Sequence, residues 1–192
     1  MPSTPLFPAF LRLEDLPVLL VGAGPVAASK LSALLDAGAQ VTVVAPEIRP
    51  EIERAQVRIV RRAFEPADLD GAWFAVAAAP PEINRAVRVA AEARRVFLNA
   101  ADDPAAASVY LGGVVRKAGV TLAISTGGRA PALAGLLREA LEALLPGDLD
   151  DWLTLADRLR ERWRDGSVPF ADRRPLLLRA LVEKYAASGS AP

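Results

Sequence analysis

Small residues between an apolar run and a helical pattern form the first candidate site of this 192-residue chain. Gly22, Gly24 and Ala27 follow the apolar residues 18–21, and an amphipathic helical pattern begins directly after them. Gly22 permits a sharp turn, Gly24 lets the backbone approach a phosphate, and Ala27 lets the helix pack close to the strand. Because a helix start also offers free N–H groups to an anion, the pattern predicts a dinucleotide site. A glycine-rich turn that binds nothing is the alternative. The contacts predicted in this turn are Gly22, Gly24, Pro25 and Val26.

The end of the second apolar run, residues 41–45, bears on the choice of dinucleotide. A typical NAD site carries an acid there, about 20 residues after the glycines, that binds the ribose 2′-OH. In this chain Ala45 and Pro46 stand near that place, and Glu47 follows them. Glu47 either turns back to the ribose or is a solvated loop acid, and Arg49 is close, so the pattern favours NAD over NADP only slightly. The cofactor contacts predicted here are Ala45, Pro46 and Glu47, with Ala78 at the end of a later apolar run.

Two adjacent carboxylates follow another apolar run, in the motif Asn99-Ala-Ala-Asp-Asp-Pro. Neighbouring side chains on a turn point apart, so only one of them needs to face a site. Asp103 precedes Pro104 and fits a helix N-cap, which leaves Asp102 for chemistry. A carboxylate beside a nicotinamide acts as a general base or orients the substrate, and Asp102 is therefore the predicted catalytic residue.

A second loop of small residues, 125–129, precedes a strong helical pattern. It either cradles an anion at the helix start or is a turn capped by Ser125 or Thr126, and the sequence leaves both interpretations open. No metal ligand is predicted. The residues predicted to bind substrate are Asn99, Ser108, Ser125, Thr126, Gly127 and Arg129.

The composition excludes several kinds of chemistry. The chain has no Cys and no His, which excludes disulfides, thiolate nucleophiles, zinc sites built on these residues and a Ser–His pair. Lys+Arg and Asp+Glu balance at 23 each, so we expect no nucleic-acid partner and no membrane partner. No basic, apolar leader and no long apolar span is visible, so a cytoplasmic protein is expected.

The elements around these residues alternate between strand and helix patterns over the first hundred residues, which predicts an α/β fold with a Rossmann-type parallel sheet. Ligands of such sheets bind at the carboxyl ends of the strands, where Gly22, Ala45, Ala78 and residues 99–102 fall. Strands are expected at 17–21, 41–45, 57–60, 72–78 and 95–100, and helices at 25–37, 48–55 and 81–93.

The pattern changes after residue 106. Residues 108–115 and 120–124 suit an antiparallel pair, and 130–145, 149–164 and 172–187 suit helices. We expect a dinucleotide-binding domain at 1–106, a small α+β dimerisation segment at 107–146 and a C-terminal helical region at 147–192. The middle segment is too small to bury both its faces, so a homodimer is expected; packing of its leucine stripe onto the C-terminal helices is the alternative.

Several of these motifs occur together in one family. The matching pieces are Pro5-Leu-Phe-Pro, Val21-Gly-Ala-Gly-Pro-Val-Ala-Ala-Ser-Lys, Val41-Thr-Val-Val-Ala-Pro, Asn99-Ala-Ala-Asp-Asp-Pro with Ala107-Ser, and Ser125-Thr-Gly-Gly-Arg-Ala-Pro-Ala-Leu-Ala. With these the chain resembles the precorrin-2 dehydrogenase / sirohaem synthase N-terminal domain family over nearly its whole length. The family has Ser-Ser-Gly-Gly in the late loop, where this chain has Thr126.

The resemblance implies a function. Members remove two hydrogens from precorrin-2 to give sirohydrochlorin, with NAD as the hydride acceptor, and some also insert iron to make sirohaem. The family's key aspartate falls on Asp102, its NAD contacts fall around Gly24 to Val26 and at Pro46 and Glu47, and its members are homodimers. No methyltransferase domain follows, so we do not expect this chain to make precorrin-2. The alternatives are a bifunctional dehydrogenase and ferrochelatase, and a non-catalytic NAD-binding sensor.

Overall fold

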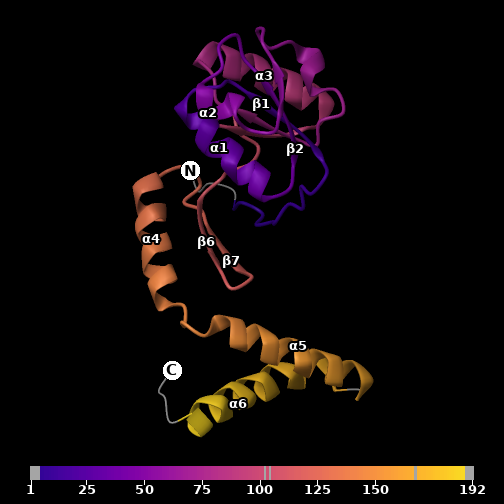
Figure 1. Cartoon of the computed structure of the whole chain (residues 1–192), viewed down its shortest axis with the longest axis vertical. Helices are drawn as coiled ribbons and strands as arrows, with labels where there is room; N and C mark the ends of the chain where they lie inside the picture. The colour runs from indigo at the N-terminus through magenta and orange to yellow at the C-terminus, as the bar shows by residue number, and fades with distance from the viewer. Residues whose placement is uncertain (1–4, 102, 104, 167, 189–192) are drawn as a thin grey trace. The chain divides into compact units, whose positions relative to one another are not determined.

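The computed structural model describes residues 5–101, 103, 105–166 and 168–188 (Figure 1). The chain divides into two compact units, Met1–Leu111 and Gly112–Pro192, which are described one after the other. No helix among the described residues is both long and apolar enough to cross a bilayer.

A five-stranded sheet organises the first unit. All its neighbouring strands are parallel, in the order β3-β2-β1-β4-β5, which confirms the predicted Rossmann-type sheet. Its strands are β1 (Pro17–Val21), β2 (Gln40–Val44), β3 (Arg58–Val60), β4 (Phe74–Ala77) and β5 (Phe97–Ala100). Its helices are α1 (Pro25–Asp36), α2 (Pro50–Glu53), the 3-10 helix η1 (Pro66–Leu69) and α3 (Pro81–Arg94).

Apolar side chains alternate between the two faces of this sheet. Val18 and Leu20 join a core with α1, whereas Leu19 and Val21 join a second core with α3. Strand β1 is therefore buried on both faces, which explains its unbroken apolar sequence. Each such side chain contributes about 1.5–3 kcal/mol when it leaves water, so the central strand fixes the position of the turn that follows it.

The second unit begins with an antiparallel hairpin of β6 (Gly113–Lys117) and β7 (Val120–Ile124). Helix α4 (Pro131–Leu144) packs closely on it, since a Cβ at Gly113 would lie 2.9 Å from the carbonyl oxygen of Ala134. The chain continues into α5 (Leu149–Asp165) and α6 (Phe170–Ser188), which pack against each other (Figure 1).

The structure corrects two local expectations. The strand predicted at 108–115 begins only at Gly113, because the N–H groups of Ser108 and Val109 donate to the carbonyl of Leu98 and so lie beside β5. The helix expected after Asp103 is a turn. Its carboxylate still accepts a hydrogen bond from the N–H of Ala106, as an N-cap would.

Candidate functional site

Four of the predicted site residues lie at the carboxyl edge of the sheet in the first unit. Beyond the ends of the strands, Gly22 N–H donates to the Val44 carbonyl at 2.9 Å, and Ala78 N–H donates to Val21 at 2.8 Å. Ala45 N–H donates to Val60 at 3.2 Å. The ladder therefore continues past the strands and holds the start of each following loop in register, with Asn99 in the adjacent strand β5.

Gly22 makes the closest backbone approach at this edge. A Cβ built on it would lie 2.2 Å from the carbonyl oxygen of Ala78, and its φ of +101° is one that side chains rarely adopt. Both facts require glycine at this position, so two neighbouring loops can meet where a ligand of this edge would sit.

Gly24 serves a different purpose from Gly22. It is the N-cap residue of α1, its φ is −82°, and a Cβ built on it would meet nothing within 4 Å. Among the described residues no side chain caps α1, and Pro25 occupies its first turn, so the N–H groups of that turn are left for a ligand or water. An open space in front of an uncapped helix of twelve residues fits a pyrophosphate, and the partly exposed Val26 lies beside it.

The loop after β2 would face the ribose of such a dinucleotide. Pro46 and Glu47 are exposed, while Ala45 is buried at the strand end. Arg49 donates two hydrogen bonds to Glu51, at 3.2 and 3.1 Å. This pairing raises the pKa of Arg49 and lowers that of Glu51, so the guanidinium has a carboxylate partner of its own.

Nearby, Arg61 is paired with Glu53, and Arg62 makes a two-pronged contact with the carboxylate of Asp68 at 2.8 and 2.6 Å. The hydrogen bond from Arg62 holds the pKa of Asp68 below its ordinary value. Sequence reasoning missed this pair. Asp68 also accepts the N–H of Glu65, which fixes the turn of η1 after β3.

Asn84 is a second residue that the sequence did not single out. It is 4% exposed, in the first turns of α3, and its Oδ1 accepts the N–H of Ala79 at 3.1 Å. That bond holds the turn after β4, whose Ala78 carbonyl faces Gly22. An Asn on the apolar face of a helical pattern, in step with Val87 and Ala91, was the signal available for it.

Of the predicted catalytic and substrate residues in the first unit, Asp102 lies outside the described residues. Asn99 is 6% exposed and donates from Nδ2 to the carbonyl of Val109 at 2.9 Å, and its Oδ1 has no partner among the described residues. The hydroxyl of Ser108 accepts the N–H of Leu98 at 2.8 Å. The substrate contacts predicted for Asn99 and Ser108 therefore compete with bonds inside the protein.

The loop at 125–129 belongs to the second unit. Gly127 N–H donates to Ser125 Oγ, and Ala130 N–H donates to Thr126 Oγ1, both at 3.1 Å. This is the capped-turn geometry that the sequence left as one of two interpretations. Gly127 and Gly128 both have positive φ, and the exposed Arg129 has no ion pair within the described part of the chain.

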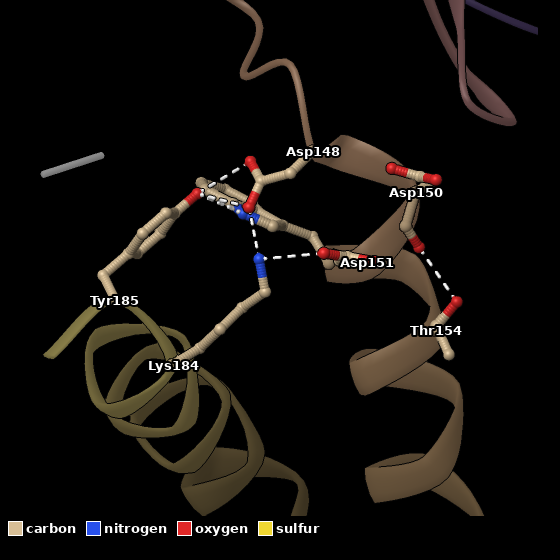
Figure 2. Close-up of polar contacts among 7 residues, drawn as sticks. Asp148, Asp150, Asp151, Thr154, Lys184 and Tyr185 are labelled. Atoms are coloured by element: carbon tan, nitrogen blue, oxygen red, sulfur yellow. Dashed lines mark hydrogen bonds and ion pairs between the residues drawn. The ribbon is translucent and has the colours of Figure 1, made fainter. Parts of the chain in front are cut away.

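A polar cluster joins the start of α5 to the end of α6 (Figure 2). Lys184 pairs with Asp148 and with Asp151, and the hydroxyl of Tyr185 contacts Asp148 at 2.9 Å while accepting Trp152 Nε1–H at 2.7 Å. The hydrogen bond from Lys184 lowers the pKa of Asp148, and the same contact raises that of Lys184. Each charged group has its partner here, so the cluster fastens two helices.

Within the described residues no group of three or more His, Cys, Asp or Glu side chains could hold a metal ion.

Comparisons with known proteins agree with this geometry. Residues 9–113 match the model of an NAD(P)-binding family, and residues 119–144 match the central segment of a sirohaem biosynthesis protein. The chain is 43% identical to siroheme synthase 3 of Aeromonas hydrophila over 91% of its own length, and 40% identical to siroheme synthase of Citrobacter koseri over 87%. It spans 38% of the length of each of these relatives.

A solved structure has the same fold. The structure described as SirC, precorrin-2 dehydrogenase, superposes with a TM-score of 0.68 and 23% sequence identity. The match covers 91% of this chain and 88% of that one, so the likeness in fold extends over both units.

Proposed function

Because the chain belongs to the NAD(P)-binding family matched over residues 9–113, we propose that it catalyses the NAD-dependent dehydrogenation of precorrin-2 to sirohydrochlorin. The observation that carries the proposal is the glycine edge of the sheet, Gly22 and Gly24 before the uncapped helix α1, in a chain about 40% identical to siroheme synthases. The reaction removes two hydrogens, one as hydride and one as a proton.

The cofactor would lie along the carboxyl edge. Gly24, Pro25 and Val26 would hold the pyrophosphate at the start of α1, with Ala78 beside the nicotinamide half. When bound, NAD supplies the acceptor for the hydride. Ala45, Pro46 and Glu47 would line the ribose. We propose NAD rather than NADP because Arg49 and Arg61, two arginines near this end, are already paired with Glu51 and Glu53.

A side chain of the protein must accept the proton that leaves the substrate. In a protein with no His and no Cys, a carboxylate is the natural group to receive it or to fix the substrate's orientation. Asp102, which follows β5 in the sequence, is the proposed catalytic residue. Precorrin-2 carries several carboxylates, and Arg129, with the 125–129 loop, would attract them.

We further propose that the chain works as a homodimer through residues 107–146, between a cofactor domain at 1–106 and a helical region at 147–192. The support is helix α4, in which Ala134 packs inward while a stripe of leucines is left open to solvent. The exposed leucines of the stripe are Leu133, Leu136, Leu137, Leu141 and Leu144. A second copy would cover them. We also propose that the reaction takes place in the cytoplasm, where NAD is available as a soluble cofactor.

Insertion of iron into sirohydrochlorin is a second candidate activity, favoured by the name siroheme synthase that the relatives carry. Iron would be a substrate here. Adding ferrous iron or cobalt to the protein and sirohydrochlorin tests it, and a rate equal to that without protein rejects it.

The main proposal is tested by mixing the purified chain with NAD and freshly made precorrin-2. We expect NADH absorbance and sirohydrochlorin to appear together, and more slowly with NADP. Asp102→Asn should abolish turnover and leave NADH affinity unchanged. A folded wild-type chain that binds NADH and turns over no precorrin-2 would refute the dehydrogenase and favour the sensor.

A further inference from the structure

The loop after β3 begins directly beside the end of β2. The carbonyl of Val60 accepts two hydrogen bonds, one from the N–H of Ala45 across the sheet and one from the N–H of Arg62 farther along the chain, both at 3.2 Å. The backbone of Arg62 therefore lies next to Ala45, at the strand end where the ribose of the dinucleotide is proposed to bind.

The order of the strands indicates which part of the dinucleotide this loop would meet. The sheet runs β3-β2-β1, with the pyrophosphate proposed at the turn after β1 and the ribose at the loop after β2. Neighbouring strands are about 4.8 Å apart, so each step across the edge matches one small group of the cofactor. The adenine on that ribose would extend away from the pyrophosphate, over the carboxyl end of β3.

The guanidinium of Arg62 is fixed at this end of the sheet. It donates to both carboxylate oxygens of Asp68, at 2.8 and 2.6 Å, and to the carbonyl of Ala63 at 2.9 Å. The Asp68 side chain is only 9% exposed and accepts the N–H of Glu65, while the adjacent Leu69 is buried in the core shared with α3. The guanidinium is therefore held in one orientation before a ligand binds.

These bonds leave the planar faces of the Arg62 guanidinium for another partner. The donors of a guanidinium lie in its plane, so a two-pronged contact with a carboxylate occupies an edge of the group. The Arg62 side chain is still 39% exposed. An arginine whose charge is already paired is poorly suited to bind a phosphate but well suited to stack on an aromatic ring.

We propose that Arg62 is a cofactor-binding residue whose guanidinium, held by Asp68, stacks on the adenine ring of the dinucleotide. The inference rests on the proposed function, which puts the dinucleotide at this edge of the sheet. Loss of one such stacking partner weakens binding of a base by about 5- to 100-fold.

The test compares the binding of NADH, ADP and inorganic pyrophosphate, the last two by competition with NADH. Arg62→Lys keeps the positive charge and removes the planar group, so NADH and ADP should each bind about 5- to 100-fold more weakly. Pyrophosphate carries no base, and its affinity should stay within about twofold of wild type. Asp68→Asn keeps the guanidinium but weakens its hold, so NADH affinity should fall between those of wild type and Arg62→Lys.

Arg94→Lys is the matched control. Arg94 is also paired with an aspartate, Asp70, at 2.6 Å, but it lies at the end of α3, just before the amino end of β5. This variant should bind all three ligands as wild type does, and thermal unfolding of each variant reports whether the fold is retained.

Two results would overturn the inference. One is NADH and ADP affinity unchanged in Arg62→Lys, and the other is an equal loss for pyrophosphate, which would mean that the residue does not act on the base. A wild-type chain that binds NADH but turns over no precorrin-2 would count against the proposed reaction and leave the role of Arg62 supported by the binding data. A folded wild-type chain that binds neither NADH nor ADP would overturn both.

Discussion

Gly22 and Gly24 stand two residues apart in one turn, yet the structure gives them opposite sensitivities to a methyl group. At Gly22 an added Cβ would lie 2.2 Å from the Ala78 oxygen, more than 1 Å inside the 3.4 Å at which ordinary contact begins, with φ at +101°. At Gly24 the Cβ would meet nothing within 4 Å and φ is −82°. Gly22→Ala should therefore damage the fold, and Gly24→Ala should damage only the binding of the dinucleotide.

The expected magnitudes follow from these contacts. For Gly22→Ala the unfavourable φ costs about 1–3 kcal/mol, and the backbone shift that relieves the overlap adds about 1–3 kcal/mol. A loss of about 3 kcal/mol lowers the thermal midpoint of a unit of this size by roughly 12 °C. Gly24→Ala changes an N-cap residue and costs about 1 kcal/mol or less. Its methyl would enter the space proposed for the pyrophosphate, so NADH should bind at least about tenfold more weakly.

Gly71→Ala is the control that separates strain from overlap. Gly71 has φ of +80°, but a Cβ there would meet nothing within 4 Å, so this variant carries the backbone strain alone. Thermal unfolding and titration of NADH fluorescence give both quantities for all three variants. If Gly24→Ala binds NADH as the wild type does, the pyrophosphate does not occupy that space. If Gly22→Ala is no less stable than Gly71→Ala, the close approach to Ala78 does not govern this turn.

Three further outcomes are expected. Tyr185→Phe removes the hydroxyl that contacts Asp148, and amides of α5 and α6 should exchange about fivefold faster, equivalent to about 1 kcal/mol; unchanged exchange would show that the cluster does not fasten the helices. Leu136→Glu places a charge in the exposed stripe of α4, so the proposed dimer should dissociate at least about tenfold more readily in sedimentation experiments; an already monomeric wild type contradicts the proposal. Pairing lowers the pKa of Asp68, so its bond with Arg62 stabilises the fold above the ordinary carboxylate pKa and is lost as pH falls through the lowered one. The gap in thermal midpoint between wild type and Asp68→Asn should therefore begin to narrow below about pH 4 and should disappear below the lowered pKa of Asp68; a constant gap would refute this.

The parallel sheet and its glycine edge could be predicted because their signals are local in the sequence. Strand β1 is buried on both faces and reads as an unbroken apolar run, and its end is marked by Gly22. Gly24 and Pro25 mark the start of α1 in the same way. Each of these features depends on residues within one turn of each other, so periodicity and turn chemistry suffice to find them.

The polar contacts that hold the edge could not be predicted by the same means. Arg62 donates hydrogen bonds to Asp68 across a turn, and the side chain of Asn84 accepts the N–H of Ala79. Ser108 shows the limit more sharply. An apolar-rich stretch after it suggested a strand from residue 108, but its N–H pairs with Leu98, ten residues earlier. Which of two possible partners a backbone group takes depends on how the sheet is assembled, and no local pattern records that choice.

Most of the contacts at the carboxyl edge of the sheet fix the position of the backbone, and few of them fix the position of a reactive side chain. The backbone carbonyl and N–H groups of Gly22, Ala45 and Ala78 lie at the carboxyl edge. The open space at Gly24 lies in front of the uncapped helix α1. A site of this kind suits a reaction in which a bound dinucleotide does the redox work, because the protein then needs shape, a field for an anion and one proton-handling group. It follows that substitutions around the edge should act mainly through steric fit, as at Gly22 and Gly24. Loss of chemistry with the fold and NADH binding intact is expected for Asp102, the proposed catalytic residue.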